Sequence, residues 1–598
     1  MASQRAYSFT RQPDPENMSN SPADSGSCCG GPPSPMMGVQ PEDLTTLPPL
    51  SSSTATWTLK VWPWRRQTTD YQKIKDHKYP GKGTMESPYV VDWLPDDAEN
   101  PMGWTAFYRW ALCIFVAIAT LAVTFCSSAY SGGAREIIHD FGTTQIKFVL
   151  GVSLFVLGFA VGPLLWAPLS EIFGRRLLFI VTYIILTAFN AGACGAQNID
   201  TLLVLRFFAG AVGSSPLTNA GGTIADCFPA KQRGLATCVF AAAPFMGPAL
   251  GPIVGGFVGQ TIGWRWIEGV MAIFSGVITI VGFFLYPETY APVLLRKRAL
   301  MLSQDTGLHY VSKFEAQKKL KYSQLFKISL SRPWILLFKE PIVLLMSIYM
   351  AIAYGILYML FAAYPIVFQQ KRGWSPGIGG LAFLGVLVGM LFAIVYTVFE
   401  NIRYSKVVDR LGGRAPPEER LPSAIVASFF LPVGLFWFAW TNSPSIHWIS
   451  PVAAGAPFGF GMVLVFLAVM NYLIDTYVIY AASVLAANSV LRSLFGMAFP
   501  LFTSSMYANL GIHWASSIPA FLALACIPAP IIFYLYGSKI RGMSKYATEA
   551  EEALNKMMSR PSQAPMEEKE AGGIAEEEKA REEVIIQTQE TSGQKESV

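Results

Sequence analysis

Apolar runs of about 20 residues recur between residues 105 and 537, most of them separated by short polar loops. A helix of that length crosses the ~30 Å hydrocarbon core of a bilayer. Charged residues make up only 14% of the chain, against roughly 25% in soluble globular proteins. We therefore predict an all-α membrane protein. Its twelve expected spans are 107–128, 147–168, 177–197, 201–223, 235–258, 264–286, 341–363, 379–400, 421–441, 446–470, 482–508 and 514–536.

One long interval divides these spans into two sets of six. Shifting the first set by 249 positions aligns Asp226 with Asp475, Gly210 with Gly459 and Gly247 with Gly496. We therefore expect two six-helix bundles related by pseudo-two-fold symmetry, as in transporters built from parallel repeats. The predicted parts are a disordered cytoplasmic tail (1–104), the first bundle (105–286), a cytoplasmic linker (287–340), the second bundle (341–537) and a charged cytoplasmic tail (538–598).

Basic residues gather in alternate loops, which fixes the expected orientation. Cytoplasmic loops carry an excess of Lys and Arg. We therefore place the set of loops that is richer in Lys and Arg in the cytoplasm, together with the linker and both termini. The richer loops hold Arg175, Arg176, Lys231, Arg233, a cluster between Arg296 and Lys339, and Arg403, Lys406, Arg410, Arg414 and Arg420. The opposite loops hold Arg135, Arg265, Lys371 and Arg372.

The sequence also excludes several classes of function. The net charge of +5 is small and scattered, which argues against a nucleic-acid partner. An ATP-driven pump is disfavoured because no G-x-x-x-x-G-K-[ST] phosphate loop occurs. The five histidines are dispersed and the eight cysteines lack metal-ligand spacing. We expect no catalytic site, metal or cofactor, and a chain that works as a monomer in the lipid bilayer.

The segment GPLLWAPLSEIFGRR (162–176) ends the second predicted span and turns into the third. Gly174 can take the positive φ that a tight turn needs. Asp226, which closes the fourth span, is expected to pair with an arginine here, and such an ion pair can latch one conformation of a two-state bundle. The alternative is that the arginines only mark topology and the acid is solvated. The candidate gating loop comprises Gly162, Glu171, Gly174, Arg175 and Arg176.

Arg206 lies inside the fourth predicted span, in LLVLRFFAGAVG. An arginine at the middle of a span costs roughly 2.5–3.5 kcal/mol to insert, so such residues usually face a water-filled path or a partner. The alternative is that its aliphatic stem lets the charge reach the outer headgroups. The first span has no Asp or Glu. The acids nearest a membrane path are Glu268, Glu288, Glu400, Asp475 and Asp226, none of them plainly central.

The fifth span contains GPALGPIVGG (247–256). Its glycines recur every four residues, so they share one helix face along which a neighbouring backbone can approach closely. Its prolines remove intrahelical hydrogen bonds and bend the helix, while membrane packing can satisfy the freed carbonyls. Such a face suits a sliding contact between the two halves, and static tight packing is the alternative. The residues concerned are Gly247, Pro248, Gly251, Pro252, Gly255 and Gly256.

Together these motifs resemble the major facilitator superfamily, specifically its fungal drug:H⁺ antiporters with twelve spans, over about residues 100–540. GPLLWAPLSEIFGRR is similar to the loop 2–3 signature, with Glu171 where most members have Asp. LRFFAGAVG is similar to the fourth-span signature, with Ala209 where many members have Gln. GPALGPIVGG looks like the antiporter motif of the fifth span. The resemblance implies proton-coupled export, and we assign proton coupling to Arg206 and Asp226.

A path for a small-molecule cargo needs polar and aromatic side chains that face inward. Aromatic rings suit flat or cationic hydrophobic compounds, although such residues more often serve in packing or interfacial belts. The candidates are Asn219, Tyr358, Tyr364, Asn471, Tyr472, Asn488 and Arg492.

We expect an exporter of lipophilic drugs, toxins or fungal secondary metabolites at the plasma membrane, driven by the proton gradient through alternating access. Polyamine:H⁺ export is the first alternative, which the shortage of central acids disfavours. Uptake of a nutrient or sugar is the second, and it fits YPETY after the sixth span less well.

Overall fold

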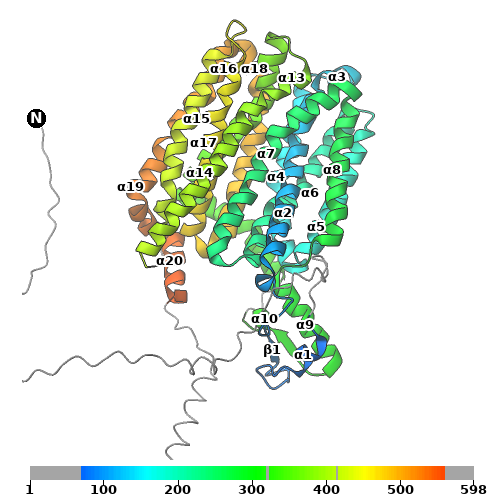
Figure 1. The fold of residues 1–598 in the computed structure, drawn as a ribbon, viewed down its shortest axis with the longest axis vertical. Helices are drawn as coiled ribbons and strands as arrows, with labels where there is room; N and C mark the ends of the chain where they lie inside the picture. Colours follow the sequence, from blue (N-terminus) through cyan, green and yellow to red (C-terminus); the bar gives the residue numbers. More distant parts are fainter. Residues whose placement is uncertain (1–68, 318–321, 413–414, 559–598) are drawn as a thin grey trace, which may run out of the picture. The chain divides into compact units, whose positions relative to one another are not determined.

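Long helices make up most of the computed structural model, which describes residues 69–317, 322–412 and 415–558 (Figure 1). In these ranges, eleven helical stretches are long and apolar enough to cross a bilayer. The last, Val478–Met543, has 66 residues and would measure ~100 Å as one straight helix. Gly511, with φ of 70°, breaks it, so it supplies two spans. The expected all-α membrane fold with twelve spans is confirmed.

The first bundle is built from three closely packed helix pairs. These are α4 with α6, α2 with α7 and α5 with α8. Three of the helices begin where a Thr or Asn side chain accepts a backbone N–H of the first turn, as N-caps do. The bounds are α2 (Ala106–Ala129), α4 (Gln145–Phe173), α5 (Arg175–Cys194), α6 (Ile199–Cys227), α7 (Ala230–Ile262) and α8 (Trp264–Leu285), with η3 (Tyr130–Gly133) and α3 (Ala134–Asp140) between α2 and α4.

The second bundle repeats this pairing. Here α14 packs with α17, α12 with α18, and α15 with α18. The long helices are α12 (Pro341–Tyr364), α14 (Phe383–Arg410), α15 (Leu421–Thr441), α17 (Gly455–Thr476), α18 (Ala481–Ala525) and α19 (Pro528–Met543). Short elements join them: η4 (Pro365–Lys371), α13 (Pro376–Leu381), η5 (Pro417–Arg420), α16 (Ile449–Ala453) and η6 (Val478–Tyr480).

Glycines at equivalent positions make equivalent contacts in the two bundles. A Cβ at Gly210 of α6 would collide with the carbonyl of Phe155 on α4. A Cβ at Gly459 of α17 would collide with the carbonyl of Val386 on α14. Each glycine lets its helix approach the neighbouring backbone, so the predicted internal repeat is present in the packing.

A small module outside the spans corrects the predicted tail. Strand β1 (Tyr89–Val91) pairs in parallel with β2 (Tyr310–Ser312). Ile74, Val91, Leu295 and Leu302 share a core between these segments. The module also holds α1 (Tyr71–Asp76), η2 (Pro101–Gly103), α9 (Ala291–Thr306) and α10 (Lys313–Gln317). The prediction of disorder is therefore wrong for residues 69–104, whose partners lie far along the chain, while residues 1–68 lie outside the described residues.

Two ends of the bundles are distinguished below. The linker end is where α4, α6 and α8 finish and where α9 begins after the last of them. The far end is where α2, α5 and α7 finish. In Figure 1 the module of α1, β1, α9 and α10 lies at the linker end, and α3, α13 and α16 lie at the far end.

A buried ion pair holds the module together. Nη1 of Arg298 lies 2.6 Å from Oδ2 of Asp97, and Nη2 lies 2.8 Å from Oε2 of Glu99. Burial alone would raise the pKa of Asp97, but hydrogen bonds from Arg298 and Thr69 outweigh it and hold that pKa below its usual value.

Replacing Arg298 with Met is expected to loosen the module, because an unpaired buried carboxylate costs about 3–5 kcal/mol. Hydrogen exchange at the β1 amides should quicken. Lowering the pH should also loosen the module. Because the pKa of Asp97 is depressed in the folded state, the stability that its ion pair contributes is fully present above the unfolded pKa of about 3.9. This stability is lost as the pH falls through the folded pKa. Lys75→Met is the control, since its bond to Asp305 is exposed. Unchanged exchange in Arg298→Met would contradict the assignment.

The remaining linker and tail segments pack on the bundles. Helix α11 (Tyr322–Lys339) contacts α18 and α12 of the second bundle and α4 of the first. Helix α20 (Lys545–Met558) follows α19, and the Ser544 hydroxyl at its start bonds to the buried carboxylate of Glu340. The predicted linker is thus divided, with its first part in the module and its second part on the helices. The predicted tail is folded as far as residue 558, and 559–598 lie outside the described residues.

Candidate functional site

An ion pair buried inside the first bundle is the most unusual feature of the spans. Arg206 comes from α6 and Glu268 from the second turn of α8, and Nη1 lies 3.0 Å from Oε1. Both side chains are 1% exposed. Arg206 therefore does not reach the headgroups, and the alternative in which its charge lies at the surface is excluded. Sequence reasoning named Glu268 among the nearest acids but did not pair it with Arg206.

Arg206 and Glu268 differ in how many of their polar atoms have hydrogen-bond partners. Nε of Arg206 donates to the carbonyl of Gly151 at 2.9 Å, and Nη2 donates to the carbonyls of Cys126 at 3.1 Å and Ser127 at 3.3 Å. Oε2 of Glu268 is buried and has no hydrogen-bond partner among the described residues. A protonated carboxyl carries its hydrogen on one oxygen, so this oxygen is a chemically reasonable place for a proton.

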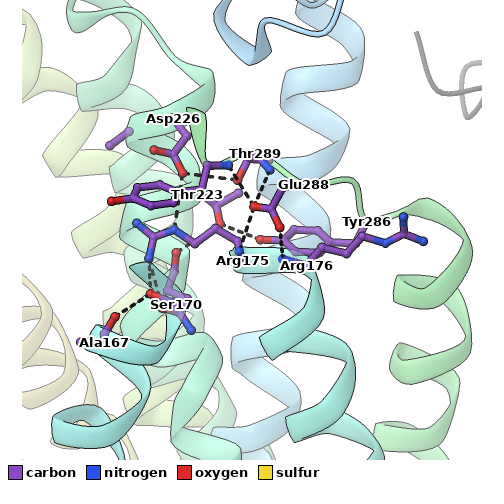
Figure 2. Close-up of polar contacts among 12 residues, drawn as sticks. Ala167, Ser170, Arg175, Arg176, Thr223, Asp226, Tyr286, Glu288 and Thr289 are labelled. Carbon is purple, nitrogen blue, oxygen red and sulfur yellow. Dashed lines mark hydrogen bonds and ion pairs between the residues drawn. The ribbon is translucent and has the colours of Figure 1, made fainter. Parts of the chain in front are cut away.

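Asp226 lies far from the buried pair of Arg206 and Glu268. It is 20 residues further along α6 than Arg206, or ~30 Å of helix, so the two residues assigned to proton coupling do not form one site. As expected, Asp226 pairs with the gating loop: its Oδ2 lies 3.5 Å from Nε of Arg175 (Figure 2). Nη1 of Arg175 also bonds to Ser170 and, at 3.4 Å, to Oδ1 of Asn219. These contacts tie the ends of α4, α5 and α6 together at the linker end.

Glu288 completes this cluster. Its carboxylate accepts the backbone N–H groups of Arg175 at 2.9 Å and Arg176 at 3.2 Å (Figure 2). A carboxylate here neutralises the positive end of the α5 dipole. Burial raises the pKa of Glu288, although these bonds and those from the N–H groups of Thr289 and Tyr290 oppose the shift. Gly174, at φ 90°, has no room for a Cβ beside Glu288.

The other two gating-loop candidates have different surroundings. Gly162 lies against Ala211 and Ser214 of α6, where a Cβ would collide. Glu171 is exposed. Gly162 therefore acts in helix packing, whereas Glu171 lies outside the hydrogen-bonded cluster.

The second bundle has a corresponding pair at the linker end. Oδ2 of Asp475 lies 2.9 Å from Nε of Arg420 and accepts the Tyr404 hydroxyl at 3.3 Å. Asp475 is the repeat equivalent of Asp226, and each closes the fourth helix of its bundle. Both bundles therefore end this helix in an aspartate–arginine pair.

The glycine-rich segment of α7 makes two kinds of contact, which corrects one prediction. Gly247, Gly251 and Gly255 face α2, where their Cβ atoms would collide with Thr124, Ser128 and Ala129. These three glycines therefore lie within the first bundle and not between the halves, because the face that they share points toward α2.

The adjacent face of α7 instead packs on α13 and α14 at the seam between the halves, and α4 packs on α18 at a second contact of this seam. A Cβ at Gly256 would lie 2.6 Å from the carbonyl oxygen of Pro376 on α13, and one at Gly380 of α13 would collide with the carbonyl of Pro252. Oε1 of Gln260 accepts the N–H of Gly377 at 3.0 Å. α7 carries three internal prolines, among them Pro248 and Pro252. At the far end α7 and α13 thus approach backbone to backbone at Gly256 and Gly380, and the side chain of Gln260 bonds across the contact.

A cavity of about 10 Å³ lies between the halves and is lined by one charged residue, Arg492 of α18. Its guanidinium lies over the rings of Tyr354, at 4.6 Å, and Phe466, at 5.0 Å. The Tyr354 hydroxyl bonds to that of Tyr358 at 3.4 Å, which bonds to Ser127 at 2.8 Å. Since the Ser127 carbonyl accepts from Arg206, polar groups connect the cavity with the buried ion pair.

Four of the other five cargo-path candidates lie away from this cavity. Tyr364 packs among aromatic rings of the second bundle, and Tyr472 packs near Phe533. Asn471 lines a separate small pocket near Arg420, and Asn219 belongs to the gating cluster. The fifth, Asn488, donates to the hydroxyl of Ser347 and to the sulfur of Met350, which belongs to the cavity wall. The structure therefore brings Tyr358, Asn488 and Arg492 to the surroundings of this cavity and separates the other four candidates from it.

Comparison with known proteins agrees with this architecture. The family model described as Major Facilitator Superfamily matches residues 116–500, more than half of the chain. The chain belongs to the major facilitator superfamily. The solved structure of the proton:xylose symporter XylE of that superfamily, bound to 6-bromo-6-deoxy-D-glucose, superposes with a TM-score of 0.53 at 15% identity, covering 72% of this chain and 96% of that one. At this identity the likeness concerns the fold alone.

Two fungal relatives are much more similar to this superfamily member. The "MFS-type efflux pump MFS2" of Trichophyton rubrum is 62% identical over 523 residues, covering 86% of this chain and 88% of its own. The "Major facilitator superfamily multidrug transporter mdrA" of Aspergillus fumigatus is 61% identical over 500 residues, covering 83% and 82%. The predicted resemblance to fungal transporters of this superfamily is confirmed.

Proposed function

We propose that this superfamily member is a proton-coupled efflux transporter that exports small lipophilic drugs, toxins or fungal secondary metabolites. It works in the plasma membrane, with both termini and the linker end in the cytoplasm. Relatives named as an efflux pump and a multidrug transporter support export. The excess of Lys and Arg in the loops of the linker end supports the orientation.

The observation that carries proton coupling is the buried pair of Arg206 and Glu268. In a low-dielectric interior, a neighbouring cation stabilises the ionised form of a carboxylate. Protonation removes the negative charge that attracts this cation. When Glu268 takes a proton from outside, the ion pair weakens and Arg206 keeps only its backbone carbonyl partners. When the proton leaves, the pair forms again. The pair thus has two states whose relative stability depends on the proton gradient.

The halves alternate by making and breaking contacts at the two ends. At the far end the backbone contact between α7 and α13 closes the outer side. At the linker end the pairs of Arg175 with Asp226 and of Arg420 with Asp475 fix the inner ends of their bundles. Each of these ion pairs lies within one bundle, so it keeps that bundle rigid while the halves move relative to each other. The hydroxyls of Tyr358 and Ser127 bond across the halves and connect cargo and proton sites.

The experiment that tests the proposal uses purified protein in liposomes with an imposed pH gradient and a panel of labelled lipophilic compounds. Cargo is expected to move against the direction of proton flow, and a proton ionophore should stop its accumulation. Glu268→Gln, which keeps the size of the protonated carboxyl, should exchange cargo without responding to the gradient. Equal accumulation by the wild-type protein with and without a gradient would refute proton coupling.

A further inference from the structure

Arg492 is the second arginine buried in the spans, and its surroundings are unlike those of Arg206. The whole residue is 8% exposed. Among the described residues no carboxylate lies within ion-pair distance of it, and its Nε is buried without a hydrogen-bond partner. A buried cation without a counter-ion is unfavourable, and intramembrane charges of this kind mark ligand pathways. The side chain therefore has a bonding capacity that the chain itself does not use.

The position of this guanidinium points to a ligand rather than to packing. It belongs to the wall of the cavity between the halves, together with Phe245 of α7 and Met462 of α17. The rings of Phe245 and Phe466, one from each half, meet edge to face at 4.6 Å across it. The cavity measures about 10 Å³, whereas small-molecule sites take ~300–1,000 Å³. A cargo can therefore enter only when the halves part at this aromatic contact, and it then meets Arg492 directly.

We infer that the cargo is an organic anion, an aromatic or conjugated compound carrying a carboxylate or an equally acidic group that Arg492 binds. This inference rests on the proposed export function and names its substrate class. Arginine presents two parallel N–H donors that match a carboxylate. The rings of Tyr354 and Phe466, which flank the guanidinium, offer faces on which a planar cargo stacks. A polycation such as a polyamine would be repelled by the same charge.

The route from Arg492 to the ion pair gives the anion a way to act on proton coupling. Tyr354 lies under the guanidinium and bonds to Tyr358, whose hydroxyl reaches Ser127 in the other half. An anion that draws Arg492 toward itself changes the contact of Arg492 with Tyr354. Tyr354 is thus a positioning residue between the two sites.

The test compares aromatic acids with their uncharged amides, beginning with 1-naphthoate and 1-naphthamide. Bound ligand raises the melting temperature of the folded state. The acids are expected to raise it at concentrations at least about tenfold lower than the amides, and Arg492→Met should abolish this difference. Arg492→Lys, which keeps the charge, should retain part of it.

Folding of the variant can be judged separately. Because Arg492 pairs with no described carboxylate, Arg492→Met leaves no orphaned acid and should melt no lower than the wild type. Arg206→Met is the matched control and should melt lower. A preference for acids that survives in Arg492→Met, or the absence of any preference across the panel in the wild type, would overturn the inference.

Transport gives a second readout that separates this inference from the proposed function. When the same number of protons is exchanged for each cargo molecule, export of an anion moves one more charge across the membrane than export of the corresponding uncharged amide. An imposed potential, negative on the cargo side, should therefore accelerate export of the acids more than export of the amides. An equal response would count against an anionic cargo. If acids bind through Arg492 but no compound responds to a proton gradient, the proposed coupling fails and the anion site stands.

Discussion

Replacing Arg206 with Met is expected to abolish export driven by a pH gradient, lowering it by at least about 100-fold. The change leaves the Glu268 carboxylate buried without its cation, which costs roughly 3–5 kcal/mol. That energy shifts the carboxyl toward its protonated form, so the site no longer releases the proton that it takes up. The measurement is cargo accumulation in liposomes under an imposed gradient, with the amount of folded protein determined by size-exclusion chromatography.

Arg265→Met is the matched control for this change. Arg265 also forms an ion pair, with Asp140 at 3.5 Å, but its side chain is 43% exposed. Exposed pairs contribute about 0–1 kcal/mol, so this variant should export normally. Gradient-driven export that persists in Arg206→Met would show that the buried pair plays no part in coupling.

Adding a single methyl group at Gly255 is expected to separate α7 from α2 and to destabilise the first bundle. The new Cβ of Gly255→Ala would overlap the carbonyl of Ala129, and neither backbone can move aside as a side chain would. Overpacking of this kind costs at least about 1–3 kcal/mol. The melting temperature and the yield of monodisperse protein should both fall sharply.

Gly221→Ala provides the opposite case in α6. Apart from the adjacent backbone of α6 itself, no atom lies within 4 Å of the position that its Cβ would take. Alanine is favoured over glycine inside a helix by about 1 kcal/mol. This variant should be as stable as the wild type or more stable. If Gly255→Ala melts like Gly221→Ala, close backbone contact is not what requires the glycine.

The spans could be predicted because each is specified locally. An apolar run of about 20 residues has to cross the bilayer as a helix, whatever the rest of the chain does. The pairing of Asp226 with Arg175 could also be predicted, since both residues end helices that reach the same side. Local composition, charge and turn signals were sufficient for these features.

Other features depend on contacts between distant segments. Residues 69–104 are polar enough to look disordered, and only their pairing with residues 291–317 gives them a core. The direction of the glycine face on α7 required knowledge of which helix lies beside it. One feature of the sequence pointed to the partner of Arg206. Glu268 lies at a similar depth from the same end of its own span, so the two opposite charges could form an ion pair inside the bundle.

The pairing of β1 with β2 has a consequence for how the chain is made. The ribosome releases β1 before the first span and β2 only after the sixth. At 5–20 residues per second, β1 waits on the order of 10–40 s for its partner. The strands can therefore pair only once all six helices between them have been translated. Their pairing connects the segment before the first bundle with the segment after it, before the second bundle has been synthesised.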